Sequence, residues 1–286
     1  MPIELKHVSY SYGTGSAQEK AALENLSCFI ADGEFVGIMG HTGCGKTTLI
    51  QMIAGLLCPT SGQILLDGED INGKNYRREL LRKTVGLVFQ YPEYQLFEST
   101  VEKDVAFGLK RSGLSREEKM GRVKEALSLM GFSYENIHNI SPLSLSGGEK
   151  RRVAIAGVLV TKPRILIFDE PIAGMDPNGR IRFLHLVEKL HKKGTTVLMI
   201  SHHTDSLCEY ASRILVMQQG RIVLDGPPKE VLLDIPRAER FSVGTSQARL
   251  ISDQLIRRGI PLASDILQYH ELLEALTALW KEGDSI

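Results

Sequence analysis

The sequence has little cysteine, a single tryptophan and no excess of charge of either sign. Four cysteines and one tryptophan occur among 286 residues, and 34 lysines and arginines balance 34 aspartates and glutamates. The cysteines are scattered without metal-ligand spacing, which favours reduced thiols over a disulfide framework and makes the cytoplasm the expected compartment. Because the net charge is zero, no overall field draws the chain onto nucleic acid or anionic lipid, and any anion binding must be local.

Long apolar runs are missing as well. No stretch approaches the roughly 18 consecutive apolar residues of a membrane-spanning helix, because charged residues such as Lys162, Asp169 and Glu170 interrupt the richest segments. No basic stretch followed by an apolar one opens the sequence, so we expect no secretory signal and a chain that begins at Met1. The composition, 43% hydrophobic and 24% charged, is that of a folded globular protein of one large domain, alone or with an appendage.

Short β-rich runs alternate with helical patterns, and this alternation predicts an α/β domain. The expected strands are 4–12, 35–39, 63–66, 84–89, 165–168, 196–200 and 214–217, with a hairpin from the last of these into 222–224. The expected helices are 46–54, 116–130, 178–192 and a short one that ends at 233. Continuous apolar strands separated by helices indicate a buried parallel sheet. The strandless stretch from 101 to 160 therefore predicts a helical insertion into that domain.

The main domain is expected to close near Pro236, which divides the chain into 1–236 and a C-terminal part at 237–286. Two helical patterns follow that boundary, and each carries an apolar stripe that needs a surface to cover it. Two interpretations stay open. The stripes cap their own domain, or they bind another subunit.

One segment matches the phosphate-binding loop pattern and lies between an apolar strand and a helix, as such a loop must. Its residues are Gly40, His41, Thr42, Gly43, Cys44, Gly45, Lys46 and Thr47. Glycines allow backbone N–H groups to converge on a β-phosphate, and the helix N-terminus adds partial positive charge. Lys46 would reach the β- and γ-phosphates, Thr47 would offer its hydroxyl to Mg²⁺, and Thr48 would support the α-phosphate. The alternative is a structural glycine turn, and Cys44 is either a redox-sensitive thiol or a small residue that fits the loop.

Two acids end the apolar strand expected at 165–168. Asp169 and Glu170 should therefore lie at the carboxyl edge of the parallel sheet, beside the phosphate loop. Asp169 would hold Mg²⁺ through water together with Thr47. Glu170 points to the other face of the strand end, where a general base would polarise the attacking water. The alternative for such a pair is a helix N-cap, which the order of the motifs disfavours.

A second anion-binding segment precedes an apolar helical pattern at 153–160. Ser146, Gly147 and Gly148 stand at the start of that helix, without a lysine of the kind found in the phosphate loop. Taken in chain order, the phosphate loop, this segment and the acid pair resemble the motifs of ATP-binding cassette (ABC) proteins, whose signature sequence the second segment matches. The resemblance covers residues 1 to about 236.

The resemblance implies a fold, a cofactor set and an assembly. The fold is a P-loop NTPase of the ABC type, with a RecA-like core, an antiparallel β subdomain and a helical subdomain inserted at about 91–160, followed by a small C-terminal helical domain. The implied cofactors are ATP and Mg²⁺. The implied assembly is a head-to-tail dimer, in which ATP bound at Lys46 is covered by Ser146 and Gly148 of the facing subunit. ATP hydrolysis lets the two subunits separate, so the reaction drives a conformational change.

Smaller segments resemble further parts of the cassette. Tyr12 matches the aromatic residue that stacks on adenine, and Gln90 matches the glutamine between core and helical subdomain, both a catalytic group and a metal ligand. His202 matches the switch histidine that contacts the γ-phosphate, and residues 173–176 match the D-loop. Taken alone, Tyr12 would be a strand-surface aromatic, Gln90 a polar strand end and His202 a satisfied core histidine. The resemblance makes Glu170, His202 and Gln90 the expected catalytic groups.

Within the cassette proteins, the segment 90–97, the D-loop and the tail at 265–276 are similar to the ATPases of energy-coupling factor transporters, which import vitamins or metal ions. The segment 90–97 is closer to the second of the two ATPases in such systems. The resemblance implies a peripheral protein on the cytoplasmic face of the cell membrane. The implied partners are a second cassette ATPase, a transmembrane scaffold subunit that docks behind Gln90, and a substrate-binding membrane subunit.

The chain keeps both its phosphate loop and its signature, so a heterodimer with a related ATPase and a homodimer both fit. The sequence departs from the family pattern at His203, where many cassettes have an acid, and at Ile172 and Met175 near the D-loop. None of these changes removes a catalytic group. His203 is either a pH sensor or a solvated turn residue.

Other functions compete with the importer hypothesis. A soluble cassette ATPase acting on DNA or ribosomes would carry a long coiled-coil insertion, a second cassette or a basic stripe, and the sequence has none of these, so no nucleic-acid partner is expected. A nucleotide sensor that binds ATP without turnover would not need Glu170 and His202. The ATPase of another importer type, for cobalt or nickel, also stays open.

Overall fold

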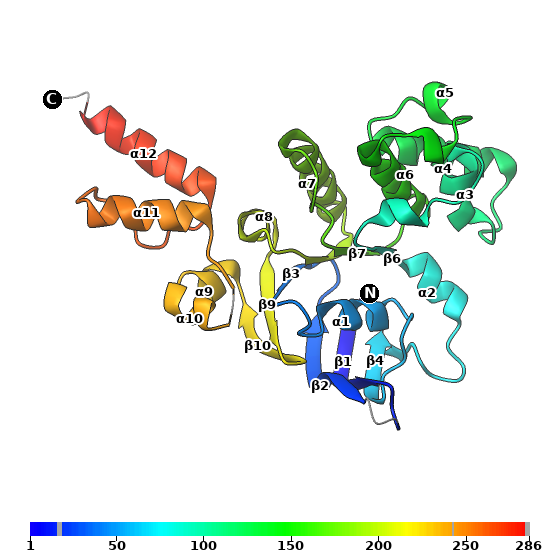
Figure 1. Cartoon of the computed structure of the whole chain (residues 1–286), viewed down its shortest axis with the longest axis horizontal. Coiled ribbons are helices and arrows are strands. Elements are labelled where there is room, and N and C mark those ends of the chain that lie inside the picture. Colours follow the sequence, from blue (N-terminus) through cyan, green and yellow to red (C-terminus); the bar gives the residue numbers. More distant parts are fainter. Residues whose placement is uncertain (16–18, 242, 284–286) are drawn as a thin grey trace.

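The computed structural model describes residues 1–15, 19–241 and 243–283, and in that part helices surround two sheets (Figure 1). The strands are β1 (Ile3–Tyr12), β2 (Lys20–Ile30), β3 (Phe35–Met39), β4 (Ser61–Leu66), β5 (Glu69–Asp70), β6 (Val85–Val88), β7 (Ile165–Asp169), β8 (Thr196–Ile200), β9 (Arg213–Gln218) and β10 (Arg221–Gly226). The α-helices are α1 (Lys46–Ile53), α2 (Arg78–Thr84), α3 (Val101–Ala106), α4 (Arg116–Leu129), α5 (Tyr134–Ile137), α6 (Gly147–Leu159), α7 (Pro177–Lys192), α8 (Thr204–Tyr210), α9 (Pro228–Leu232), α10 (Ile235–Arg240), α11 (Gln247–Arg257) and α12 (Tyr269–Gly283). Short 3-10 helices are η1 (Pro92–Gln95), η2 (Phe107–Leu109) and η3 (Pro142–Ser144).

The larger sheet has six strands in the order β10-β9-β3-β8-β7-β6. Its strands run parallel from β9 to β6, and β10 pairs antiparallel with β9 at one edge. The carboxyl ends of parallel strands meet at one edge of a sheet, so the residues that follow β3, β6, β7 and β8 come together there. The predicted α/β class with a parallel sheet is confirmed.

The central strands are buried on both faces, which is why their sequences are apolar without alternation. Every residue of β3, β7 and β8 is buried. Alternate side chains still enter different clusters, since Phe35 and Met39 pack with α7 and α8 on one face, whereas Val36 and Ile38 pack with α1 on the other (Figure 1). The sheet is therefore a partition between two hydrophobic cores.

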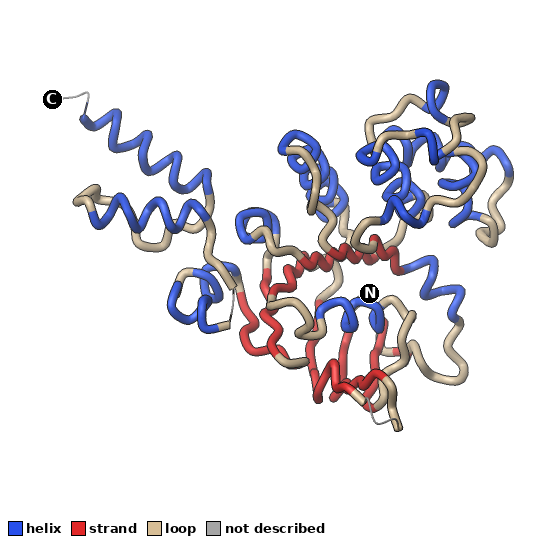
Figure 2. Tube along the Cα trace, viewed as in Figure 1, coloured by secondary structure: helices blue, strands red, loops and turns tan. Residues whose placement is uncertain are grey.

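The smaller sheet is antiparallel, with its four strands in the order β2-β1-β4-β5. Its buried residues, among them Leu5, Val8 and Leu23, share one core with α1. Figure 2 shows these strands in red below the edge-on parallel sheet, with α1 between the two sheets. The antiparallel β part that the family resemblance implies is present.

The segment predicted to be helical at 101–160 forms α3 to α6, which gather at one end of the molecule (Figure 1). Val105 of α3, Val123 and Leu127 of α4 and Val153 of α6 are buried together, and their cluster continues into the upper face of the parallel sheet. The signature helix α6 is thus packed both on its own helical neighbours and on the core.

Strand β2 was not predicted, and its pairing explains why. The buried residues Leu23, Leu26 and Ile30 are three and four positions apart, which is a helical rather than a strand spacing. Register shifts interrupt its pairing with β1 between Leu5 and Val8 and again before Ser11, so the alternation expected of a regular strand is lost. Helix α2, just before β6, was also not predicted.

The C-terminal part begins with short helices and ends in the pair α11 and α12. Pro236, the expected domain boundary, is the second residue of α10. Ala248, Ile266 and Leu272 form a small core of their own between the last two helices. In the described ranges, no helix combines the length and the apolar character needed to cross a membrane.

Candidate functional site

The phosphate loop leaves β3 and enters α1 through a left-handed backbone. Gly40, Gly43 and Gly45 have φ values of 140°, 82° and 107°, a region that residues with a Cβ rarely adopt. At two of these positions, close contacts with other backbone atoms also leave no room for a Cβ. A Cβ on Gly40 would lie 2.2 Å from Met217 O, and one on Gly45 would lie 2.5 Å from Ala22 O. The loop folds this closely because glycine stands at these positions.

Distant segments support the loop from behind, and no local pattern predicts them because they are far along the chain. Gly220, in the turn between β9 and β10, donates its N–H to Cys44 O at 3.0 Å. Cys44 is buried, with its Sγ 3.9 Å from Lys46 Nζ, so a small side chain is what the space admits. The open side of the loop is formed by His41, which is half-buried, and by the exposed residues Thr42 and Gly43.

Lys46 lies inside the curve of the loop. Its side-chain Nζ donates to Gly40 O at 2.6 Å and to His41 O at 3.0 Å, and the residue is 8% exposed. A buried ammonium whose nearest hydrogen-bond acceptors are neutral carbonyls gains strongly from an anion placed beside it. The loop therefore presents its positive charge where the phosphates of a nucleotide would lie.

Thr47 and Asp169 meet across the edge of the sheet, one from α1 and one from the end of β7. The Thr47 hydroxyl donates to Asp169 Oδ2 at 3.0 Å, and Asp169 is buried. Burial raises the pKa of Asp169, while the Thr47 hydrogen bond and the charge of Lys46 oppose that shift. Hydroxyl and carboxylate oxygens at this separation are the donor set that Mg²⁺ prefers. Within the part that the structure describes, no group of three or more His, Cys, Asp or Glu side chains could hold a metal ion.

Glu170 follows directly and turns to His202, at the end of the neighbouring strand. The His202 backbone N–H donates to Glu170 Oε2 at 3.3 Å, and His202 Nε2 lies 3.6 Å from Glu170 Oε1. Burial raises the pKa of Glu170, and the His202 ring and backbone oppose the shift. Glu170 Oε1 is buried and has no hydrogen-bond partner. A carboxylate with a free oxygen and a raised pKa is suited to accept a proton from water.

The family resemblance predicts that Tyr12 stacks on adenine and that Gln90 is both a catalytic group and a metal ligand. The Tyr12 hydroxyl and Thr48 Oγ1 share a hydrogen bond of 3.0 Å, and Tyr12 is 44% exposed, so its ring is accessible beside α1. Gln90 is exposed and follows β6, whose last residue Val88 pairs with Phe168. Gln90 therefore leaves the same edge of the sheet as the acid pair.

Ser146, Gly147 and Gly148 form the N-terminus of α6. Ser146 caps the helix by accepting from Glu149 N at 3.4 Å, and the Glu149 carboxylate accepts from Ser146 N at 2.9 Å. No hydrogen bond or ion pair of the described residues joins Ser146, Gly147 or Gly148 to the phosphate loop. The two anion-binding segments of one chain are thus separate.

Residues 173–176 lead from Glu170 into α7. Asp176 caps that helix by accepting from Gly179 N at 2.9 Å. His203 precedes α8, with its Nδ1 3.5 Å from Arg180 Nη1, and burial lowers the pKa of His203. His203 is therefore more enclosed than a freely solvated turn residue.

The glycine cradle, the enclosed lysine and the paired hydroxyl and carboxylate fit a nucleoside triphosphate with its magnesium ion. The structure brings Lys46, Thr47, Asp169, Glu170 and His202 together at one edge of the sheet. Sequence reasoning missed one buried side chain in the same region, Arg151, because an arginine inside a charged stretch gives no signal of burial.

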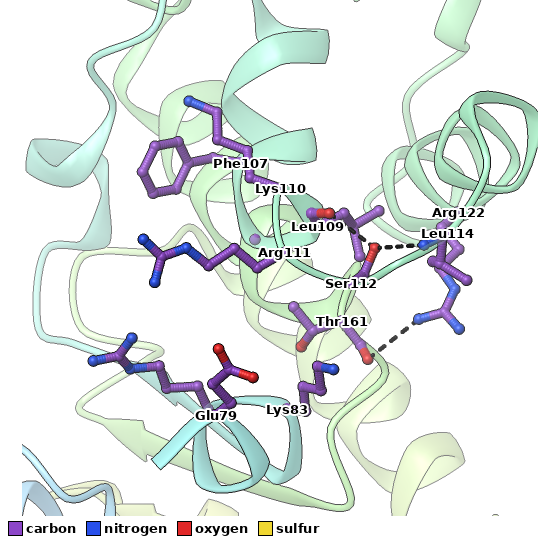
Figure 3. Close-up of a pocket in the computed structure, with 12 residues that line it drawn as sticks. Glu79, Lys83, Phe107, Leu109, Lys110, Arg111, Ser112, Leu114, Arg122 and Thr161 are labelled. Carbon is purple, nitrogen blue, oxygen red and sulfur yellow. Dashed lines mark hydrogen bonds between the residues drawn. The ribbon is translucent and has the colours of Figure 1, made fainter. Parts of the chain in front are cut away.

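A separate cavity of about 710 Å³ lies between α2 and residues 107–114 (Figure 3). The charged residues that line it are Glu79, Arg82, Lys83, Lys110, Arg111 and Arg122. Lys110 pairs with Glu98 at 2.9 Å, but no acid of the described chain pairs with Arg82, Lys83 or Arg111. This cavity is a local excess of positive charge in a chain without net charge.

Comparison with known proteins gives consistent matches. The family model described as ABC transporter matches residues 23–173. The energy-coupling factor transporter ATP-binding protein EcfA2 of Clostridium perfringens is 44% identical over 285 residues, which cover 99% of this chain and 100% of that protein. The EcfA2 protein of Caldanaerobacter subterraneus is 46% identical over 96% of each chain.

Solved structures agree with these relatives. The chain resembles cbiO1 from Clostridium perfringens, described as part of the ABC transporter complex cbiONQ, with 37% identity and a TM-score of 0.71 over 90% of this chain and 96% of that one. It also resembles the ATP-binding cassette MJ0796, solved as a dimer in a post-hydrolysis state bound to ADP and Pi, with 31% identity and a TM-score of 0.70 over 79% of this chain and 98% of that one.

Proposed function

The chain belongs to the ABC transporter family and, within it, to the energy-coupling factor transporter ATP-binding proteins, and we propose that it powers a membrane importer of a vitamin or another micronutrient. The family predicted from the motifs is confirmed, and the relatives carry the name of the second ATPase, EcfA2. The chain is thus an ABC ATPase. The observation that carries the proposal is the meeting of Lys46, Thr47, Asp169 and Glu170 at one edge of the sheet.

Each residue of the site has a role in the proposed reaction. The backbone N–H groups of the phosphate loop and the Lys46 ammonium bind the phosphates of ATP, and the exposed face of Tyr12 stacks on adenine. Mg²⁺ supplies positive charge to the β- and γ-phosphates when bound, and Thr47 and Asp169, with Gln90, are the residues that would hold it. Thr48 supports the α-phosphate from the start of α1.

Glu170 orients the attacking water and takes its proton. Its buried position raises its pKa, which makes it a stronger base. His202 lies beside it on the solvent side, 61% exposed, where its ring contacts the γ-phosphate. Because Glu170 is held by the His202 backbone N–H, the two groups act as one unit.

We propose that a second ATPase completes the site. The signature residues Ser146 and Gly148 start a helix whose N–H groups have no phosphate of their own chain to bind, because the phosphate loop is on another part of the fold. A head-to-tail pair brings these N–H groups onto the ATP held by Lys46 of the facing subunit. Either a related ATPase or a second copy of the chain meets this requirement.

We propose further that the chain lies on the cytoplasmic face of the cell membrane, bound to a scaffold subunit that also holds a substrate-binding membrane subunit. The cavity in Figure 3 supports a docking site at the boundary between the core and the helical part, since Phe107 and Leu109 give it an apolar wall. The unpaired charges of Lys83 and Arg111 favour a scaffold segment that carries acidic side chains.

Co-purification tests this assembly. Tagged Glu170→Gln protein is expressed in its native host, and membranes are extracted with mild detergent in the presence of ATP and Mg²⁺. The expected result is recovery of a second cassette ATPase and a polytopic membrane protein. Any small membrane subunit recovered with them would identify the cargo class. Recovery of soluble ribosomal or nucleic-acid partners alone would overturn the importer proposal and leave the ATPase chemistry intact.

A charge reversal tests the docking surface. The double change Lys83→Glu and Arg111→Glu is expected to reduce recovery of the scaffold without weakening ATP binding. The matched control is Lys189→Glu with Lys193→Glu, which reverses two exposed charges near the end of α7. Equal losses of scaffold in both variants would contradict docking at this cavity.

A further inference from the structure

Arg151 is a buried arginine that reaches out of its own helix. It is 6% exposed and lies one turn beyond Gly147, at the start of the signature helix α6. Its Nη1 donates to Ala173 O at 2.5 Å, and its Nη2 donates to Glu170 O at 3.2 Å. One side chain therefore joins the helix that begins at the signature to the loop that follows the base.

The backbone of Glu170, which Arg151 holds, is unusual. Its φ is 49°, in the left-handed region that is unfavourable for a residue with a Cβ and persists only where its surroundings impose it. The Glu170 N–H donates to Ile200 O at 3.0 Å, and the Glu170 carbonyl accepts from Ala173 N at 3.3 Å as well as from Arg151. Arg151 is the member of this set that comes from the helical part of the molecule.

Two further segments approach the same guanidinium. Glu93 and Tyr91, which follow Gln90, act electrostatically on Arg151, while burial lowers the pKa of its guanidinium. A Cβ on Gly174 would lie 4.0 Å from Arg151 Nη1, so the D-loop passes directly over the side chain. Arg151 lies where the signature helix, the loop after Glu170 and the segment after Gln90 converge.

A cavity of about 710 Å³ adjoins this junction. Its lining includes Gly147 and Gly148 at the start of α6, Ala173 and Gly174 of the D-loop, and Arg151. The two hydrogen bonds of Arg151 join the α6 part of this lining to the backbone of Glu170 and Ala173. Movement of the signature would therefore reach the backbone of Glu170 through this side chain.

We propose that Arg151 is a positioning residue, which sets the orientation of Glu170 according to the position of the signature helix. This inference rests on the proposed function, because it assumes that Glu170 is the base and that the signature binds the facing subunit's ATP. When ATP draws the start of α6 toward the facing subunit, Arg151 carries that displacement to the carbonyls of Glu170 and Ala173. Hydrolysis in one site then depends on occupancy of the other.

The chemistry of this position favours arginine over lysine. The planar guanidinium donates to two carbonyls of different residues at once, and it stays charged when buried. A lysine ammonium is a single compact centre and cannot reproduce the fork. Arg151→Lys therefore keeps the buried charge and removes the paired hydrogen bonds to Glu170 O and Ala173 O, whereas Arg151→Gln removes both the charge and the paired hydrogen bonds.

The test measures steady-state ATP hydrolysis in the co-purified complex for the parent, Arg151→Gln and Arg151→Lys. Both variants are expected to lower kcat by roughly 10- to 100-fold, the effect of misplacing a catalytic group, while KM for ATP stays close to the parent value. Arg151→Gln is also made together with Glu170→Gln. No additional loss of kcat is expected in that double variant, because Arg151 acts through Glu170.

Arg164→Gln is the matched control. Arg164 pairs with Asp32 at 3.3 Å at the opposite end of β7 from Glu170, so its loss is expected to leave kcat unchanged. Thermal unfolding checks that each variant is folded, and if Arg151→Gln is not, Arg151→Lys decides the question. A folded variant with the kcat of the parent would overturn the inference, as would a further loss in the double variant. A parent complex without ATPase activity would instead overturn the proposed function.

Discussion

His202 and Glu170 face each other across the ends of two neighbouring parallel strands. Asp169, the last residue of β7, pairs with Ile200, the last residue of β8, and each catalytic candidate follows its strand within two residues. The His202 N–H donates to Glu170 Oε2 at 3.3 Å, and the His202 ring nitrogen Nε2 lies 3.6 Å from Oε1. The Glu170 side chain is 13% exposed and that of His202 is 61% exposed, so Glu170 is enclosed while His202 is open to solvent.

Replacement of Glu170 by glutamine keeps the shape of the side chain and removes its ability to accept a proton. We expect hydrolysis to fall by roughly 10²- to 10⁴-fold, the usual contribution of a general base, while ATP binding is retained and a closed dimer accumulates. Single-turnover hydrolysis and size-exclusion chromatography with ATP and Mg²⁺ measure both effects. Turnover at the rate of the parent would show that Glu170 is not the base.

The raised pKa of Glu170 gives a pH dependence with a definite sign. The folded protein binds a proton at Glu170 more readily than the unfolded chain does, so ionisation of this carboxyl opposes folding. Glu170→Gln should therefore unfold at a higher temperature than the parent at neutral pH. The difference should shrink as pH falls through the raised pKa and disappear below the ordinary glutamate pKa of about 4.3.

Thermal unfolding without nucleotide, at a series of pH values, measures this difference. Glu117→Gln is the control, because Glu117 is exposed on α4. Hydrolysis by the parent should decline over the same acidic interval, since the base must be ionised to act. A stability difference that grows as pH falls would contradict the assignment.

Lys46→Ala removes the enclosed ammonium of the phosphate loop. Because Lys46 Nζ donates to Gly40 O and His41 O, its loss takes away both the charge proposed to bind the phosphates and a support of the loop. We expect ATP affinity to fall by roughly 100-fold or more, in line with the loss of charged hydrogen bonds. Isothermal titration calorimetry measures the affinity, and Lys162→Ala, on the surface beside Glu125, is the control that should bind ATP normally.

Gly40 and Gly43 form a matched pair for the loop geometry. Both have positive φ, but a Cβ on Gly40 would meet Met217 O at 2.2 Å, whereas nothing lies within 4 Å of a Cβ on Gly43. Gly43→Ala should lower the free energy of unfolding by about 1 kcal/mol, the cost of the left-handed backbone. Gly40→Ala should lower it by roughly 3 kcal/mol or more, because a backbone clash adds to the strain. Chemical denaturation compares the two, and equal effects would contradict the close contact.

Leu273 tests the role of the C-terminal helices. It is 67% exposed on α12, whereas its neighbour Leu272 is 6% exposed in the small core beneath. If the tail binds another subunit, Leu273→Glu should weaken the ATPase pair while changing the free energy of unfolding by no more than about 0.5 kcal/mol. Sedimentation of the variant with ATP measures the association. An unchanged dimer would favour the other interpretation, in which the tail caps its own domain.

Strong local signals were enough to predict much of this protein. The strand at 196–200 was placed at its observed bounds, and the helix at 178–192 was placed within one residue, because their apolar patterns are set by burial along one short segment. The phosphate loop was predicted for a similar reason. Its glycines must adopt positive φ wherever the loop occurs, so the local sequence alone shows this requirement.

Contacts between distant segments were not predictable in this way. Strand β2 was missed because bulges in its pairing with β1 replace strand alternation by a helical spacing. No local pattern predicts the hydrogen bond from Gly220 to Cys44 or those from Arg151 to Glu170 and Ala173. In each case the two partners lie in different segments, and only the fold brings them together.

The sequence by itself determined the proposed chemistry of the site, because phosphate binding, metal binding and proton transfer each require particular side chains at short, fixed spacings. The tertiary structure decided how those groups act on one another. The carboxyl ends of parallel strands bring Asp169, Glu170 and His202 to one edge of the sheet, and burial there raises the pKa values of the two acids. Burial and orientation depend on the whole fold, so only the folded chain fixes them.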